Sequence, residues 1–338
     1  MLSQIEQQQW AEKGYCVICG KFDQQDLLNA RTFIYKNKGT DRADFGSELE
    51  FPYKNYELNH ITLNKLLIKT VKQLLKTDEI LLIQSTAWLK YGQNEKTSKQ
   101  NLSSNNDQRM HMDFPNHNIL VPSSFDRPDV VGVIIYLDND HEYYNNIGGR
   151  TAIVPRNGPD DPLYQEQYSM APGLSNIPWI NDKIEAEKYF FKNNINLFKF
   201  RSELYKREIQ IPYIIGSILF YRHDVYHRGT PIKEGKSRAV INLVFKRKEL
   251  FHIHSWNKGP ARSMYDHSCT DVGSFEKLIV SLDENQRSVL GFPLLSDNYW
   301  TIDNIIQVLL RYNFNKESVL YLDLLSLLKR KQNKNQFL

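Results

Sequence analysis

The chain has 338 residues, of which 41% are hydrophobic and 12% aromatic, so it can build one large domain or two smaller ones. Its formal net charge is +4, and basic residues are interleaved with nearly as many acidic ones, so nucleic acid is not expected as a partner. No window approaches the roughly 20 apolar residues of a membrane span. No N-terminal segment has the pattern of a signal peptide, and we therefore expect a cytoplasmic protein with no membrane partner.

The three cysteines, Cys16, Cys19 and Cys269, are too few for a disulfide framework. Cys16 and Cys19 have the CxxC spacing found in redox and zinc sites. They lie in the apolar segment GYCVICG, however, with no second pair downstream and no helix of thioredoxin type after them. We interpret both as strand residues without a redox or metal role.

The N-terminal third predicts helices that pack against one face of a sheet. Residues 3–13 are typical of a helix capped by Ser3, residues 14–20 of a strand, and residues 23–35 of a second helix capped by Asp23. Residues 36–60 are polar and irregular. Residues 62–75 carry leucine and valine at helical spacing and predict a third helix.

Three apolar segments predict strands of the core. Residues 79–91, EILLIQSTAWLKY, are expected to be buried on both faces, with Gln84 as a polar exception and Lys90 reaching solvent from the strand end. Residues 130–137 and 150–155 predict two further strands. Tyr136 is a candidate to hydrogen-bond a ligand carboxylate, although a structural tyrosine with its hydroxyl at the sheet edge also fits.

Two polar segments interrupt these strands. Residues 92–109 contain almost no apolar side chain and stand directly before a histidine motif, which predicts a lid loop over a site. Residues 156–208 form a long excursion with a predicted helix near 181–198, and we interpret them as an insertion on the substrate side. Residues 209–215 return the chain to the sheet.

His111 and Asp113 stand two residues apart, and on an extended segment such residues face the same side. An imidazole and a carboxylate so placed are two of the three groups of a facial triad, which binds non-haem iron and leaves positions open for co-substrate and oxygen. With 9 histidines and 39 acidic residues in the chain, about one His-x-acid pair is expected by chance. The motif therefore needs support from another segment.

That support comes from residues 217–245, SILFYRHDVYHRGTPIKEGKSRAVINLVF. They predict a strand, a turn that carries His227, and a second strand that opens with Arg238. If the second strand folds back beside the first, the guanidinium of Arg238 approaches the imidazole of His227. An arginine there supplies the forked cation that a terminal carboxylate such as that of 2-oxoglutarate requires, and it does so better than a lysine.

After residue 248 the pattern becomes helical, with helices predicted over 273–282, 284–290, 302–311 and 316–328. The lysine-rich end, KRKQNKNQ, predicts a frayed tail. His252 and His254 form an HxH pair, and because no acid or cysteine stands at ligand spacing we interpret it as an exposed strand edge. We expect one domain over residues 1–255 and a helical extension over residues 256–338 that packs on it.

The segments quoted above resemble the phytanoyl-CoA dioxygenase-like family of Fe(II)/2-oxoglutarate-dependent oxygenases over most of the chain. AEKGYCVICGKFDQQDLLNA resembles the family's opening helix and strand, and HMDFPNH and YRHDVYHRGTP with SRAVINLVF resemble its two ligand segments. The resemblance implies that His111, Asp113 and His227 ligate iron and that Arg238 holds the distal carboxylate of 2-oxoglutarate. It also implies a mainly β fold with flanking helices around a double-stranded β-helix, the cupin-like jelly roll.

The family pattern also decides between neighbouring residues. His223 competes with His227, but the eleven-residue offset to Arg238 is the one that the family has, which favours His227. Gly229 departs from the serine of many members, and Thr230 follows it, so Thr230 and Tyr136 are the further candidates for contact with the co-substrate. His117 follows Pro115 and is interpreted as a pocket-rim or solvent residue.

The function implied by the resemblance is a dioxygenase that uses Fe(II), 2-oxoglutarate and O2 to hydroxylate a small-molecule substrate, with release of succinate and CO2. Two other classes stay open, namely a non-catalytic or zinc-binding β-barrel module and a cupin-type dioxygenase that does not use 2-oxoglutarate. Arg238 argues against both, because neither class needs a buried guanidinium at that offset.

Overall fold

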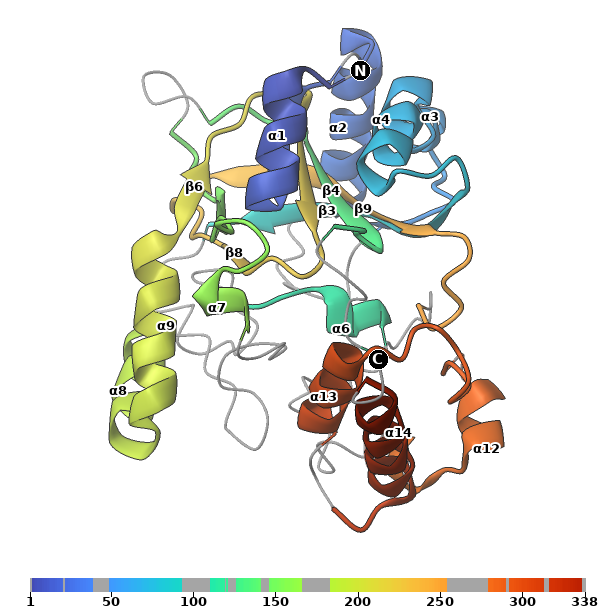
Figure 1. Cartoon of the computed structure of the whole chain (residues 1–338). Helices are drawn as coiled ribbons and strands as arrows, with labels where there is room; N and C mark the ends of the chain where they lie inside the picture. The colour runs from blue at the N-terminus through green and yellow to red at the C-terminus, as the bar shows by residue number, and fades with distance from the viewer. Residues whose placement is uncertain are drawn as a thin grey trace.

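The described part of the chain forms two antiparallel sheets with helices packed around them (Figure 1). This is the mainly β architecture with flanking helices that the sequence predicts. The computed structural model describes residues 2–20, 22–38, 49–92, 110–118, 120, 126–140, 146–165, 183–253, 279–289, 292–312 and 316–335. The expected lid lies outside the described residues, apart from Gly92.

The major sheet has six strands in the order β1-β7-β4-β9-β3-β2, and all neighbours are antiparallel. Its central strands are rich in valine and isoleucine, whose branched side chains pack well on a pleated surface. Strand β4 lies between β7 and β9, so the predicted fold-back of the Arg238 strand beside residues 217–222 is wrong. The strands are β1 (Tyr15–Cys19), β2 (Leu49–Glu50), β3 (Ile80–Tyr91), β4 (Val130–Tyr136), β7 (Ser217–Arg222) and β9 (Ser237–Arg247).

Alternation along β9 separates the two faces of the major sheet. Ala239, Ile241, Leu243 and Phe245 join the core cluster formed with the N-terminal helices. The intervening side chains of β9, from Arg238 through Val240 and Asn242 to Val244, therefore point to the opposite, inner face. Strand β3 is less buried than expected, because its Leu81 side chain is 43% exposed.

The minor sheet has three strands in the order β6-β5-β8, and its members are β5 (Thr151–Ile153), β6 (Ile209–Ile211) and β8 (His227–Gly229). His227 therefore opens a strand of this sheet, and the prediction that it lies in a turn between two strands of one hairpin is corrected. An isolated antiparallel bridge between His111 and His227 extends the sheet by one more segment.

Four N-terminal helices, α1 (Gln4–Lys13), α2 (Gln24–Lys38), α3 (Tyr56–Thr62) and α4 (Lys65–Leu75), lie on the outer side of the major sheet (Figure 1). Ser3 caps α1 through a capping box with Glu6, and the Asp23 carboxylate accepts from the first amides of α2, as predicted. Helix α3 begins within the segment predicted as irregular, residues 36–60, and ends two residues beyond it. Asn64 caps α4 and separates it from α3, so residues 62–75 are not one helix.

The predicted insertion contains α7 (Pro162–Gln165), α8 (Lys183–Asn193) and α9 (Ile195–Arg207). One helix was expected near residues 181–198, but the chain breaks at Asn194. Its side chain accepts a hydrogen bond from the Leu197 amide at 3.0 Å and caps α9. A local cap thus overrides the helical pattern.

The described C-terminal segments form a helical layer at the opposite end of the molecule from α2, α3 and α4 (Figure 1). Their cluster includes Trp300 and Ile305 together with Leu120, and the Arg311 guanidinium donates to the carbonyls of Leu120 at 2.5 Å and Asn118 at 3.0 Å. The elements are α12 (Glu284–Val289), α13 (Ile302–Arg311) and α14 (Val319–Asn335). Helix α14 continues through most of the tail that was expected to fray.

Among the helices that the structure describes, none combines the length and apolarity that crossing a membrane requires.

Candidate metal centre

A pair of directly opposed backbone segments brings His111 and His227 together. The His111 amide donates to the His227 carbonyl at 3.0 Å, and the His227 amide donates to the His111 carbonyl at 2.8 Å. Directly opposed residues of an antiparallel pair place their side chains on the same side of the ladder. The two imidazole rings consequently lie with their centroids 4.4 Å apart.

Asp113 reaches the same point from the start of α6 (Phe114–His117). The amides of Asp113 and Phe114 both donate to the His223 carbonyl at 3.0 Å, which fixes this turn against the end of β7. The Asp113 side chain makes no capping hydrogen bond to α6 and turns toward the histidines instead. His111 Nε2 lies 3.4 Å from Asp113 Oδ1, and His227 Nε2 lies 3.3 Å from Asp113 Oδ2.

Two imidazole nitrogens and one carboxylate oxygen of these residues all lie within 4.8 Å of one another. This is the donor set and the compactness of a two-histidine, one-carboxylate site, which suits Fe(II). A single cation can be held by all three side chains on one side while its other side faces away from them. The residues present therefore fit a bound iron ion.

The backbone fixes the protonation of one ligand. His227 Nδ1 lies 3.0 Å from the Val225 carbonyl, which can only accept, so Nδ1 carries the proton. The lone pair is then on Nε2, the nitrogen that faces Asp113. Hydrogen bonding of the second ring nitrogen is the usual way in which proteins orient a metal-binding histidine.

Burial raises the pKa of Asp113, but the adjacent His227 and His111 outweigh it and hold this pKa well below its ordinary value. The carboxyl group is therefore ionised at neutral pH. An anionic oxygen between two imidazoles gives the site the charge that a divalent cation needs.

Tyr221 of β7 supports the carboxylate from the inner face of the major sheet. Its hydroxyl donates to Asp113 Oδ2 at 2.7 Å. The phenol lies across Gly132 of β4, where an added Cβ would come within 2.4 Å of the ring carbon that bears the hydroxyl. Only glycine at position 132 leaves room for this contact, and a glycine inside a strand is a known sign of such close approach. Sequence reasoning did not use that signal.

A buried ionic cluster holds the turn between β7 and β8, which lies beside the site. The Asp224 carboxylate accepts from Arg156 at 2.7 Å and from Arg222 at 2.8 Å. Burial raises the pKa of Asp224, but the two guanidinium groups hold it far below its usual range. The same turn supplies the His223 and Val225 carbonyls that position Asp113 and His227. Nothing in the sequence alone pairs Arg156 with Asp224.

Arg238 points from the start of β9 onto the inner face of the major sheet. Its side chain is only 6% exposed, and its Nε and Nη1 atoms are buried without a hydrogen-bond partner in the described part of the chain. Glu234 lies four residues before Arg238 in the chain, but it is exposed and forms no ion pair with Arg238. A buried guanidinium with unpaired donors is costly unless an anion binds there.

The two further candidates for contact with the co-substrate, Tyr136 and Thr230, have partners of their own. The Tyr136 ring centre lies 5.9 Å from the Arg238 guanidinium carbon, and the Tyr136 hydroxyl lies 2.8 Å from the Thr151 hydroxyl. Burial raises the pKa of Tyr136, so this phenol stays neutral. The Thr230 hydroxyl donates to the Arg150 carbonyl at 2.9 Å.

Three other histidines that the sequence analysis weighed, His117, His223 and His252, are all buried. His117 is buried rather than in solvent, and its Nε2 lies 2.9 Å from Gln84 Oε1. His252 is buried as well, against Tyr299, and is not at an exposed edge, while His254 lies outside the described residues. His223 is 3% exposed, lies outside the three-residue cluster, and burial lowers its pKa to about 3.

Cys16 and Cys19 lie in β1, the strand that the sequence predicts for them. Cys16 is buried and Cys19 is exposed, and both thiols are free. Burial raises the pKa of Cys16 far above its usual value, which makes its thiol unreactive. Cys269 lies outside the described residues.

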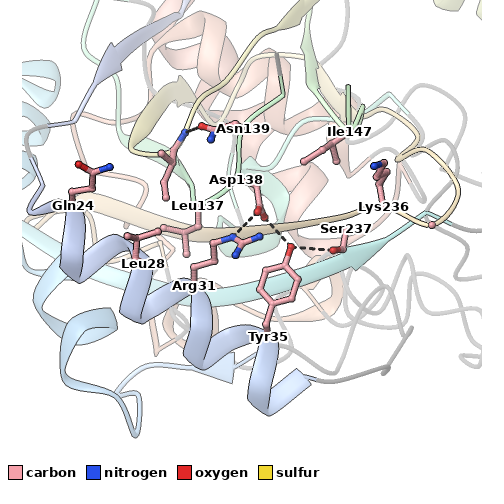
Figure 2. A pocket seen from close by; sticks show the side chains of 12 residues that line it. Gln24, Leu28, Arg31, Tyr35, Leu137, Asp138, Asn139, Ile147, Lys236 and Ser237 are labelled. Carbon is pink, nitrogen blue, oxygen red and sulfur yellow. Dashed lines mark hydrogen bonds and ion pairs between the residues drawn. The ribbon is translucent and has the colours of Figure 1, made fainter. Parts of the chain in front are cut away.

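A cleft of about 460 Å³ lies on the other side of the major sheet, between α2, the end of β4 and the start of β9 (Figure 2). Two of its charged groups, Arg31 and Asp138, are paired with each other. Asp138 accepts from Arg31 at 2.6 Å, from the Tyr35 hydroxyl at 3.1 Å and from the Ala239 amide at 2.6 Å. We interpret this cleft as structural, since its network fixes the start of β9 next to Arg238.

The sequence matches no protein-family model and no curated protein. Solved structures do match the fold. The non-haem α-ketoglutarate-dependent carbocyclase SnoK from nogalamycin biosynthesis superposes with a TM-score of 0.52 at 13% sequence identity, over 76% of this chain and 89% of SnoK. At this identity the likeness shows a shared fold and nothing more.

HygX from Streptomyces hygroscopicus, solved with nickel and 2-oxoglutarate bound, gives a TM-score of 0.46 at 10% identity, over 76% of this chain and 90% of HygX. The epimerase SnoN, solved with Fe3+, α-ketoglutarate and nogalamycin RO, gives a TM-score of 0.47 at 10% sequence identity, over 72% of this chain and 83% of SnoN.

Proposed function

We propose that this protein is a non-haem Fe(II)- and 2-oxoglutarate-dependent dioxygenase of the phytanoyl-CoA dioxygenase-like type, acting on a small molecule. The observation that carries the proposal is the convergence of His111, Asp113 and His227, with all three donor atoms within 4.8 Å. The shared fold with SnoK agrees with it. When bound, iron and 2-oxoglutarate supply oxidation of a substrate C–H bond by O2, coupled to decarboxylation of 2-oxoglutarate to succinate and CO2.

His111, Asp113 and His227 are the proposed iron ligands. His227 binds through Nε2, because its Nδ1 proton is committed to the Val225 carbonyl. Asp113 contributes an ionised carboxylate whose Oδ2 also accepts from Tyr221. The backbone bridge between the two histidines holds their rings together before any metal arrives, so little ordering remains to be done on binding.

Arg238 is the proposed anchor for the distal carboxylate of 2-oxoglutarate. Its unpaired Nε and Nη1 lie on two different edges of the planar guanidinium, and either of them together with Nη2 makes a fork that matches a carboxylate. Tyr136 is kept as a wall of this pocket beside the guanidinium. Thr230 is kept as a neighbouring wall residue that cannot donate to a carboxylate, because its proton goes to the Arg150 carbonyl.

We also propose that the two sheets are those of a double-stranded β-helix, with the iron site between them. Two contacts support this arrangement. The three ligands lie on or beside the minor sheet, and Tyr221 of the major sheet bonds to one of them. The division into a domain over residues 1–255 and a C-terminal extension over residues 256–338 remains a proposal of the same kind.

Hydroxylation is the proposed outcome of the reaction. Related halogenases leave an iron position open for chloride by using a small residue where this chain has Asp113. A carboxylate at that position therefore favours hydroxylation. Chlorinated product formed by the wild-type protein in the presence of chloride would contradict this assignment.

The test of the function is binding followed by turnover. Purified protein with Fe(II), kept free of oxygen, should develop a visible charge-transfer band when 2-oxoglutarate is added, and with oxygen it should slowly produce succinate even without a substrate. A zinc-binding or non-catalytic module would show neither, and a cupin-type dioxygenase would bind iron without a response to 2-oxoglutarate. Either pattern would refute the proposal.

A further inference from the structure

A row of uncharged polar side chains crosses the inner face of the major sheet. Gln84 and Thr86 of β3 point to this face, and Asn242 of β9 stands directly opposite Thr86 in the strand register. The Trp88 indole donates to the Thr86 hydroxyl at 2.7 Å, and Gln84 Nε2 lies 3.4 Å from the same hydroxyl. The facing sides of two packed sheets are normally apolar, so this row calls for an explanation.

The row is continuous with the candidate metal centre. His117 Nε2 lies 2.9 Å from Gln84 Oε1, and the His117 ring stacks on that of His223 at 5.8 Å. The His223 ring in turn stacks on that of Tyr221, with ring centroids 6.2 Å apart, and the Tyr221 hydroxyl donates a hydrogen bond to Asp113. An unbroken series of polar side chains therefore runs from the proposed iron ligands to the middle of β3 and β9.

Two members of the series have unused hydrogen-bonding capacity. Among the described residues, no group pairs with Asn242 Oδ1 or with either ring nitrogen of His223, although all three atoms are buried. The Asn242 side chain as a whole is partly exposed, so it borders accessible space. Buried polar atoms without partners are rare in folded proteins, and their cost to stability is tolerated where a ligand completes them.

The chemistry of the row selects a class of ligand. Gln84, Thr86 and Asn242 carry no charge, and the amide, hydroxyl and imidazole groups of the series both donate and accept. A hydroxyl group is likewise both donor and acceptor, whereas a hydrocarbon chain would leave Asn242 Oδ1 and the two ring nitrogens of His223 unpaired.

We propose that this row, made of Gln84, Thr86, Asn242, His117 and His223, binds the substrate through its hydroxyl groups. The substrate of the proposed oxygenase, on which this inference rests, is then a neutral, hydroxyl-rich small molecule. Its hydroxyls pair with Asn242 Oδ1 and the His223 ring while another part of the molecule lies beside the iron ligands.

The first test needs no ligand. Asn242→Leu keeps the size of the side chain and removes an unpaired polar group, so its thermal unfolding midpoint should equal or exceed that of the wild type. Asn304→Leu is the matched control, because buried Asn304 donates to the Tyr299 carbonyl at 2.7 Å and should lose stability. If the unfolding midpoint falls as far in Asn242→Leu as in Asn304→Leu, the Asn242 amide has its hydrogen-bond partners within the protein and the proposal is wrong.

The second test uses two sets of probes on the full chain without metal, with binding followed by ligand-observed NMR. The neutral polyols are trehalose, sucrose and myo-inositol, and the mainly hydrocarbon set, with a single hydroxyl group per molecule, is 1-octanol and 1-decanol. At least one polyol should bind the wild type, with affinity reduced tenfold or more in Asn242→Leu and in His223→Phe. Binding of the alkanols alone, or polyol binding that both variants retain, would overturn the proposal. Polyol binding by a protein that never turns over 2-oxoglutarate would refute the oxygenase function and leave the hydroxyl-binding row standing.

Discussion

Arg238→Ala tests the choice of co-substrate most directly. Arg238 is only 6% exposed in the wild type, and two of its guanidinium nitrogens lack partners in the described part of the chain. A bound carboxylate would therefore form a charge-assisted, forked pair in a nearly dry setting. Truncating one partner of such a pair costs on the order of 2–5 kcal/mol, which is about thirtyfold to several thousandfold in affinity.

We expect the concentration of 2-oxoglutarate for half-maximal turnover to rise more than a hundredfold in Arg238→Ala, while Fe(II) binding is retained. For Arg238→Lys this concentration should lie between the values of the wild type and Arg238→Ala, because lysine restores the charge without the fork. The control is Arg127→Ala, since the Arg127 side chain is 61% exposed and pairs with Glu249 on the surface, where such pairs contribute roughly 0–1 kcal/mol.

Unfolding measurements separate this role from a structural one. Without 2-oxoglutarate, Arg238→Ala removes a buried charge that has unpaired donors, so its unfolding midpoint should not fall. With Ni(II) and 2-oxoglutarate at about 100 times the dissociation constant, the wild type should gain about 2.7 kcal/mol, and the variant should gain almost nothing at the same concentration. A near-wild-type titration, or a large loss of stability without ligand, would refute the assignment of Arg238.

Four further outcomes follow from the site. Succinate formation should be abolished in each of His111→Ala, Asp113→Ala and His227→Ala, while circular dichroism shows an intact fold. His60→Ala, at an exposed position on α3, is the control and should keep the activity. Full activity in any of the three ligand variants would show that the replaced residue is not a ligand. Tyr221→Phe should weaken Fe(II) affinity about 10–100-fold. Gly132→Ala should weaken Fe(II) affinity by a similar factor, because the added methyl group displaces the Tyr221 phenol. The double variant should then bind Fe(II) no more weakly than either single variant. Additive losses in a metal titration would show that Gly132 acts independently of Tyr221. Asp224→Ala leaves Arg156 and Arg222 buried without their carboxylate, so the free energy of unfolding measured with denaturant should fall by about 3–5 kcal/mol. The control is Glu203→Ala, because the pair of Glu203 with Lys206 is exposed. A loss of stability in Asp224→Ala as small as in the control would mean that the cluster is solvated.

The residue types of the proposed site are readable from the sequence because its chemistry restricts them. Iron in this coordination requires imidazole and carboxylate, and arginine is the cation that best matches a carboxylate of a small dianionic co-substrate. His111, Asp113, His227 and Arg238 therefore stand out by kind and spacing. The caps at Ser3 and Asp23 are readable for a similar reason, since each satisfies amides within three residues.

Tertiary structure alone decided how these residues meet. The sequence predicted a hairpin to bring His227 and Arg238 together, but β4 separates β7 from β9, and His227 belongs to the other sheet. Strand order depends on long-range pairing, which local pattern does not encode. The Tyr221 contact across Gly132, the Arg156–Asp224–Arg222 cluster and the burial of His117 and His223 depend on that same pairing. Sequence therefore determined which side chains are available for the chemistry, and packing between distant segments determined which of them face one another.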